Sequence, residues 1–116
     1  MKPESAIQQQ IRSYLTARGI KSVHVPNGAV LAGDAKKRAI QMNALKRDGL
    51  CVGFPDLLAF APKGEIGFIE VKVEGNKLSP AQEDCHEWLI CLGHKVSVCR
   101  SIADVEETLT LWGWGA

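Results

Sequence analysis

The chain has 116 residues, of which 46% are apolar, so it is long enough for one domain (1–116) and is neither disordered nor fibrous. No apolar run reaches the roughly 18 residues of a membrane span, and the N-terminus MKPESAIQQQ lacks a signal-peptide core, so we expect a cytoplasmic protein. The net charge is +1, but residues up to Asp48 carry nine Lys and Arg against three Asp and Glu, which hints at a polyanion-facing side.

A first amphipathic helix is predicted from Pro3 to Arg18, because apolar residues recur at helical spacing before Gly19. Glu4 and Gln8 lie on its apolar stripe. Glu4 either complements the positive N-terminus of the helix or points inward towards a functional site. We favour the inward orientation for Glu4 and leave Gln8 open.

A short strand, Lys21–Pro26, and a loop that continues through Gly33 follow this helix. His24 stands between two valines of the strand, so we interpret it as structural or surface-facing. The turn residue Asn27 is a candidate for contact with a nucleic-acid backbone, and the alternative is that the loop is a simple connection.

A basic helix is predicted between Asp34, a plausible N-cap, and Gly49, a plausible stop. Its cations form either a solvated face or a phosphate-binding surface. They are Lys36, Lys37, Arg38, Lys46 and Arg47, of which the first three are our nucleic-acid-binding candidates.

A β-hairpin is predicted from strands 56–61 and 66–73, with Gly64 in the left-handed position of the loop 62–64. In that register Asp56 falls opposite Glu70. Strand alternation places Lys72 on the same face as Glu70. Two opposed carboxylates repel, so we expect a cation between them.

Mg²⁺ is the natural candidate for this cation, because it is usually held by one or two carboxylates, waters and a substrate phosphate. The carbonyl of Val71 is a further candidate ligand. Lys72 beside the ion would hold or polarise an attacking water and offset charge on the phosphate. The pattern therefore points to phosphodiester hydrolysis.

A polar turn, Glu74–Leu78, leads into a helix that is predicted to run to Leu92. Lys77 in this turn is another candidate for contact with nucleic acid. Residues 79–82 (SPAQ) fit a capping box, so the Gln82 amide either satisfies the helix N-terminus or serves the site. We interpret His86 and His94 as exposed.

The last predicted elements are a strand over Lys95–Cys99 and a helix that begins at Ser101. The order helix, strand, helix, hairpin, helix, strand, helix predicts an α/β or α+β fold, with a mixed sheet of about four strands flanked by helices. Trp112 and Trp114 in the tail must be buried against the domain or a partner subunit. The four cysteines lack zinc-site spacing, so we expect free thiols.

The order Pro55-Asp56 and then Glu70-Val71-Lys72 resembles the PD-(D/E)XK nuclease signature. With Gly53, Phe68-Ile69 and Ser79–Gln82 added, the chain resembles the virus-type replication-repair nuclease (VRR-NUC) family from its first helix to about Arg100. The resemblance implies a restriction-endonuclease-like core and a Mg²⁺-dependent endonuclease acting on branched DNA, with Mn²⁺ as a substitute ion and a 5′-phosphate on the product.

This resemblance also implies roles for individual residues. Asp56 and Glu70 would bind the metal, with Glu4 as a further acid that binds it directly or through water. Lys72 would act on the attacking water, and Gln82 would lie close to the lysine. Stand-alone viral members resemble Holliday junction resolving enzymes that act as homodimers, in which case the site of action is the host cytoplasm or nucleoid. The alternatives are a non-catalytic module that binds branched DNA and a nuclease subunit recruited by a helicase.

Overall fold

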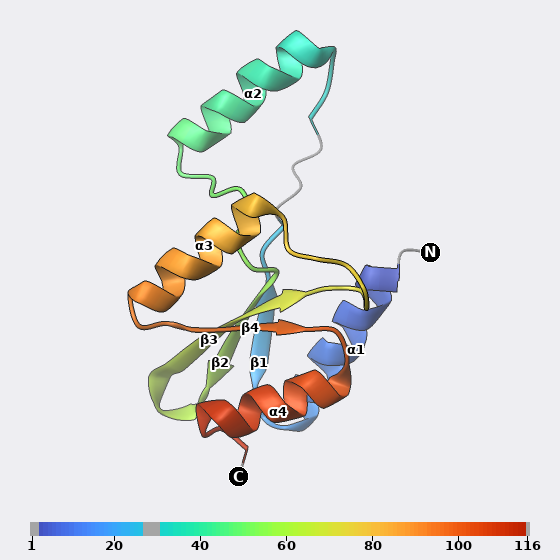
Figure 1. Cartoon of the computed structure of the whole chain (residues 1–116), viewed down its shortest axis with the longest axis vertical. Helices are drawn as coiled ribbons and strands as arrows, with labels where there is room; N and C mark the ends of the chain where they lie inside the picture. The colour runs from blue at the N-terminus through green and yellow to red at the C-terminus, as the bar shows by residue number, and fades with distance from the viewer. Residues whose placement is uncertain (1–2, 27–30, 116) are drawn as a thin grey trace.

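The computed structural model describes residues 3–26 and 31–115, and within them the predicted order of elements is confirmed (Figure 1). None of the helices in these two ranges is long and apolar enough to cross a membrane. The elements are α1 (Pro3–Ala17), β1 (Lys21–His24), α2 (Ala35–Arg47), β2 (Leu57–Ala61), β3 (Glu65–Val71), α3 (Pro80–Cys91), β4 (Lys95–Cys99) and α4 (Ile102–Trp112).

The sheet has the strand order β1-β2-β3-β4, in which β1, β2 and β3 are antiparallel and β4 runs parallel to β3. The predicted register of the hairpin is confirmed, because Ala61 pairs with Glu65 and Leu57 pairs with Ile69. The predicted strand ends were too generous: β2 begins one residue after Asp56, and β3 ends at Val71. The mixed four-stranded sheet with flanking helices confirms the predicted fold class.

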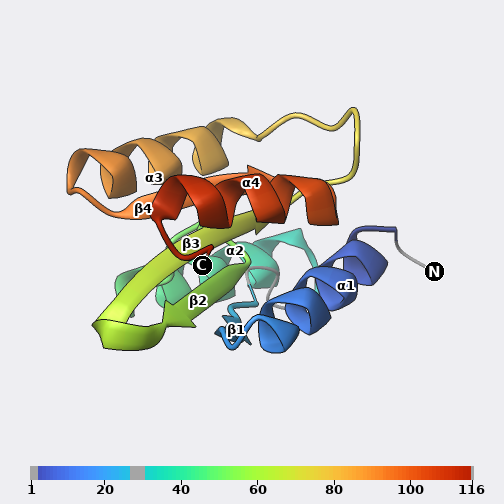
Figure 2. The same cartoon turned by 90° about the horizontal axis from the view of Figure 1, so that it is seen from below.

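The two faces of the sheet pack against different helices (Figures 1 and 2). Ile69 and Val71 of β3 join the larger core, which is formed with α1 and α4. Phe68, on the opposite face, packs with Cys85 and Leu89 of α3. Because successive strand residues point to opposite faces, Glu70 faces α3 as Phe68 does.

Helix α2 stands apart, beyond the end of the sheet (Figure 1). It begins as predicted, with the Asp34 side chain accepting a hydrogen bond from the Lys37 N–H at 2.9 Å. No residue of Ala35–Arg47 is buried, and even Ile40 is 59% exposed. Packing against the sheet therefore contributes little to this helix, which leaves its surface available to a partner.

The C-terminal tail packs against its own domain. Trp112 and Trp114 contact the larger core, with their ring centroids 4.9 Å apart in an edge-to-face arrangement. Gly67 of β3 makes room for Trp112, because a Cβ at that position would lie 2.3 Å from the indole ring. Both side chains are partly buried within the domain, which is one of the predicted alternatives.

Candidate active site

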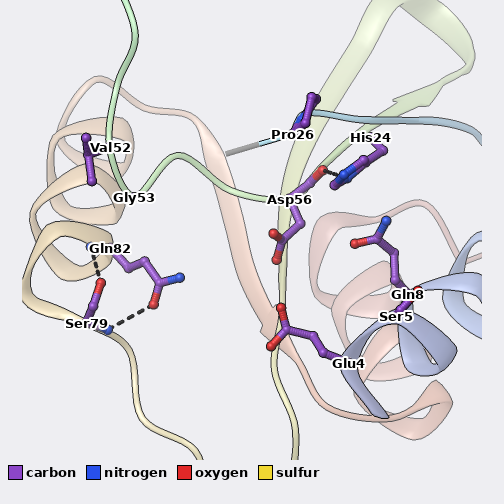
Figure 3. A pocket seen from close by; sticks show the side chains of 10 residues that line it. All are labelled: Glu4, Ser5, Gln8, His24, Pro26, Val52, Gly53, Asp56, Ser79 and Gln82. Atoms are coloured by element: carbon purple, nitrogen blue, oxygen red, sulfur yellow. Dashed lines mark hydrogen bonds between the residues drawn. The ribbon is translucent and has the colours of Figure 1, made fainter. Parts of the chain in front are cut away.

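A cavity of about 580 Å³ opens where the first turns of α1 and α3 meet the end of the sheet (Figure 3). Its walls come from α1, the end of β1 and its continuation, the segment before β2, and the cap of α3. The lining residues are Glu4, Ser5, Gln8, His24, Pro26, Val52, Gly53, Asp56, Ser79 and Gln82. Three of the five predicted catalytic residues therefore line one cavity, and the other two, Glu70 and Lys72, lie at the end of β3.

Asp56 is fixed by the strands on both sides of it. Its carbonyl accepts hydrogen bonds from the Val25 N–H at 2.8 Å and from His24 Nδ1 at 3.1 Å. Its Oδ2 accepts one from the Val71 N–H at 2.8 Å. The carboxylate is thus held at the end of the sheet although Asp56 lies outside the strand itself.

Glu70 is a buried acid, with only 1% of its surface exposed. Its Oε1 lies 3.1 Å from His86 Nε2, and its Oε2 accepts a hydrogen bond from Gln82 Nε2 at 3.3 Å. Burial above all, and then a hydrogen bond with Asp56 and the charge of that residue, raise the pKa of Glu70 to about 9. Without a cation, Glu70 therefore keeps its proton to a higher pH than an ordinary glutamic acid does.

The oxygen atoms of this pair are the kind of donor that a divalent cation would take. Within the described residues no three His, Cys, Asp or Glu side chains are grouped to hold a metal ion. A Mg²⁺ ion needs only one or two carboxylates when water and a substrate phosphate complete its coordination. In its chemistry, the donor set of Asp56, Glu70 and the Val71 carbonyl fits such an ion.

The Gln82 amide completes the helix cap and also contacts Glu70. Its Oε1 accepts the Ser79 N–H at 2.9 Å, which completes the capping box together with the bond from the Gln82 N–H to Ser79 Oγ at 3.2 Å. Its Nε2 is left to donate to Glu70. We expected capping to compete with a position at the site, but the two ends of one amide make the cap bond and the contact with Glu70 simultaneously.

Lys72 and Glu4 lie within electrostatic range of the pair. The positive charge of Lys72, directly after β3, opposes the rise in the pKa of Glu70, whereas the negative charge of Glu4 adds to it. Glu4 projects from the first turn of α1, and its carboxylate points towards that of Asp56 (Figure 3). Gln8, one turn later, also turns its amide towards Asp56.

Two histidines belong to this region although the sequence did not identify them as part of it. His86 is buried, with 6% of its surface exposed, so our prediction that it is exposed was wrong. Burial lowers its pKa. Its spacing of four residues from Gln82 places both on one helix face, and that was the available signal. His24 is exposed, as expected, but it also lines the cavity.

None of the predicted nucleic-acid contacts in the described residues lines the cavity. Lys36, Lys37 and Arg38 are exposed at the N-terminal end of α2, and Lys77 is exposed between β3 and α3. Arg38 also donates a hydrogen bond to the Gly33 carbonyl at 2.8 Å. Asn27 lies outside the described residues.

The buried acid pair predicts a pH dependence for the metal-free protein. The folded pKa of Glu70, about 9, is above its ordinary value of 4.5, so between these values the folded state binds a proton that the unfolded state has lost. The stability should therefore fall from about pH 5 to pH 9, by at most about 1.4 kcal/mol per pH unit. Urea denaturation in EDTA checks this, and Glu70→Gln should flatten the curve. A wild-type curve that rises over this range would contradict the assignment.

Comparison with known proteins agrees with this geometry. The VRR-NUC domain family matches residues 2–103. A relative named "Putative nuclease p44", from Acyrthosiphon pisum secondary endosymbiont phage 1, is 45% identical over 49 residues, which are 42% of this chain and 53% of that protein. The chain thus spans about half the length of this curated relative.

Two solved structures have the same fold. A "VRR_NUC domain" structure is 25% identical, with a TM-score of 0.68 over 95% of this chain and 97% of the other. A "VRR_NUC domain protein" is 21% identical, with a TM-score of 0.64 over 92% of this chain and 84% of the other. The second likeness concerns the fold alone. Because the family match covers most of the sequence, this chain belongs to the VRR-NUC domain family.

Proposed function

We propose that the protein is a Mg²⁺-dependent DNA endonuclease that hydrolyses phosphodiester bonds, with Asp56, Glu70 and the Val71 carbonyl as metal ligands. The observation that carries this proposal is the acid pair at the cavity, where the buried carboxyl group of Glu70 lies beside that of Asp56. Two acids placed so closely are unfavourable without a cation. The family supports a nuclease as the class of enzyme.

A bound Mg²⁺ or Mn²⁺ would neutralise the two carboxylates, polarise the scissile phosphate and lower the pKa of a bound water. Lys72 would position the attacking water and offset negative charge as it develops on the phosphate. Gln82, with its carbonyl engaged by the helix cap, can use the amide N–H that Glu70 does not occupy to orient water or phosphate. Glu4 would act through water, because it is not grouped with Asp56 and Glu70 as a third ligand.

The DNA would cross the rim of the cavity and reach α2. Pro26 and Val52, which line the cavity, lie on the two connections that lead to this helix. Lys36 and Lys37 are exposed at the N-terminal end of α2, which follows the connection from β1. Phosphates bound at the site would therefore continue onto a basic surface.

This footprint predicts a steep salt dependence of DNA binding. If about five phosphates are neutralised, the log-log slope should be on the order of −4 to −5. Lys36→Gln with Lys37→Gln should weaken binding and reduce the slope by about 2. The matched control is Lys21→Gln with Lys63→Gln at the opposite end of the sheet, which should leave the slope unchanged. Fluorescence anisotropy at several salt concentrations measures this, and a flat wild-type response excludes α2 from the footprint.

Branched DNA and a second copy of the chain are the proposed partners. Selectivity would come from DNA shape and from two paired sites. Val23, Phe60 and Ile66 are 43%, 37% and 46% exposed on the face of the sheet that α3 covers only in part. This apolar patch is a candidate contact between two copies.

The experiment is cleavage of labelled four-way junctions, flaps, nicked and linear duplexes in Mg²⁺, in parallel with light scattering. We expect a dimer that cuts branched DNA, and a Glu70→Ala variant that binds but does not cut. Binding without cleavage by the wild type would support a non-catalytic module. Cleavage that appears only after a helicase is added would support a recruited subunit.

A further inference from the structure

His86 lies one helical turn after Gln82 and faces the same acid from the same helix. Its Nε2 is 3.1 Å from Oε1 of Glu70, while Gln82 Nε2 is 3.3 Å from Oε2. Helix α3 thus contacts both oxygens of the Glu70 carboxyl group. The exposed fractions of His86 and Glu70 are 6% and 1%, so water does not compete for this contact.

Apart from His86, the buried residues of α3 are apolar. Cys85 and Leu89 of the same helix are buried in the apolar cluster beneath α3. A buried polar group is unfavourable unless it is hydrogen-bonded, so an imidazole here depends on Glu70. In return it fixes the direction of a carboxylate that lacks contact with solvent.

We propose that His86 is a positioning residue that holds the Glu70 carboxylate in the orientation in which it binds a divalent cation. This inference rests on the proposed function. An ionised carboxylate only accepts hydrogen bonds, so Nε2 carries the proton when the cation is bound. Each carboxylate oxygen has two lone pairs, and the bonds from His86 and Gln82 leave one on each oxygen for the ion or for Asp56. Loss of a contact of this kind lowers metal affinity by about 10–100-fold.

The test measures Mg²⁺ binding to the full chain by the Mg²⁺ concentration that gives half of the maximal rise in Tm, and independently by the concentration that gives half-maximal cleavage. His86→Leu removes the donor, His86→Gln keeps a donor of similar reach, and His86→Asn keeps polarity on a shorter side chain. The control is His94→Leu, because His94 is exposed and packs on Phe68 rather than on the acid pair.

We expect both midpoints to rise about tenfold or more in His86→Leu and His86→Asn, to recover at least partly in His86→Gln, and to stay within twofold in His94→Leu. A role in packing alone predicts a lower Tm in the His86 variants with unchanged midpoints, and that result overturns the inference. Should His86→Leu fail to fold, the contrast between the Gln and Asn variants decides in the same way.

The two proposals can fail separately. A wild-type chain that responds to Mg²⁺, together with His86 variants that respond at the same concentrations, overturns the role of His86 and leaves the nuclease in place. A wild-type chain that Mg²⁺ neither stabilises nor activates overturns the proposed function and the role of His86 with it.

Discussion

Glu70→Gln should abolish the stabilisation by Mg²⁺ and reduce cleavage by more than about 100-fold. A residue that only supports a metal ligand is expected to cost at most about 100-fold, so a larger loss indicates a ligand. The metal-free variant should be as stable as the wild type or more stable. The reason is that the amide removes the unfavourable burial of a second acid beside Asp56. Its oxygen can still accept from Gln82, and its NH2 group, in the place of Oε1, can donate to His86 Nε2 when that nitrogen carries no proton.

Thermal melts with and without Mg²⁺, together with single-turnover cleavage of a branched substrate, check this expectation. Glu87→Gln is the matched control, because Glu87 is an exposed acid on α3, one residue after His86. It should keep the wild-type response to Mg²⁺. A Glu70→Gln protein that Mg²⁺ stabilises as strongly as the wild type would remove Glu70 from the ligand set.

Gly53→Ala should disrupt the site from a position without any functional group. Gly53 has φ +87°, and a Cβ there would lie 2.5 Å from the carbonyl atoms of Ala81 and 2.6 Å from the Gln82 nitrogen. The left-handed conformation costs an alanine about 1–2 kcal/mol, and separating the segment from α3 should add about 1–3 kcal/mol. The segment leads directly to Asp56, so displacement by about 1 Å should lower cleavage by about 100-fold.

Gly93→Ala separates the two contributions to this effect. Gly93 has a similar φ of +91°, but nothing lies within 4 Å of its Cβ position. The Gly93→Ala variant should therefore lose only the stability that the left-handed conformation costs an alanine, and it should keep its activity. Urea denaturation and cleavage assays on both variants make the comparison. Equal losses of stability and activity in the two would show that the contact between Gly53 and α3 does not position the site.

The hairpin shows how far local pattern predicts tertiary geometry. The apolar strands and the loop of residues 62–64 predicted the register that is observed, in which Leu57, next to Asp56, pairs with Ile69, next to Glu70. One detail was not predicted: Lys63 adopts φ 69° together with Gly64. Sequence preference indicates a glycine at a left-handed position, but it does not identify a second residue that the surrounding turn holds there.

The pair of His86 and Gln82 shows the limit of that reasoning. Their shared helix face was visible in the sequence, but whether that face is turned towards the sheet depends on how α3 docks on β3 and β4. Apolar and polar residues are too mixed around the helix PAQEDCHEWLIC for one apolar stripe to define this orientation clearly. His86 was therefore interpreted as exposed, and the double role of Gln82 was interpreted as a choice between two roles.

By itself, the sequence determined the order of the elements, the four-stranded sheet, the pairing of the hairpin and the resemblance to a nuclease family. These depend on residues close together in the chain, through periodicity, caps and turns. Only the tertiary structure decided that the first turn of α1, the segment around Gly53 and the cap of α3 meet at one cavity, and that Glu70 is buried against His86. Those contacts join residues distant in sequence, and packing of the helices on the two faces of the sheet brings them together.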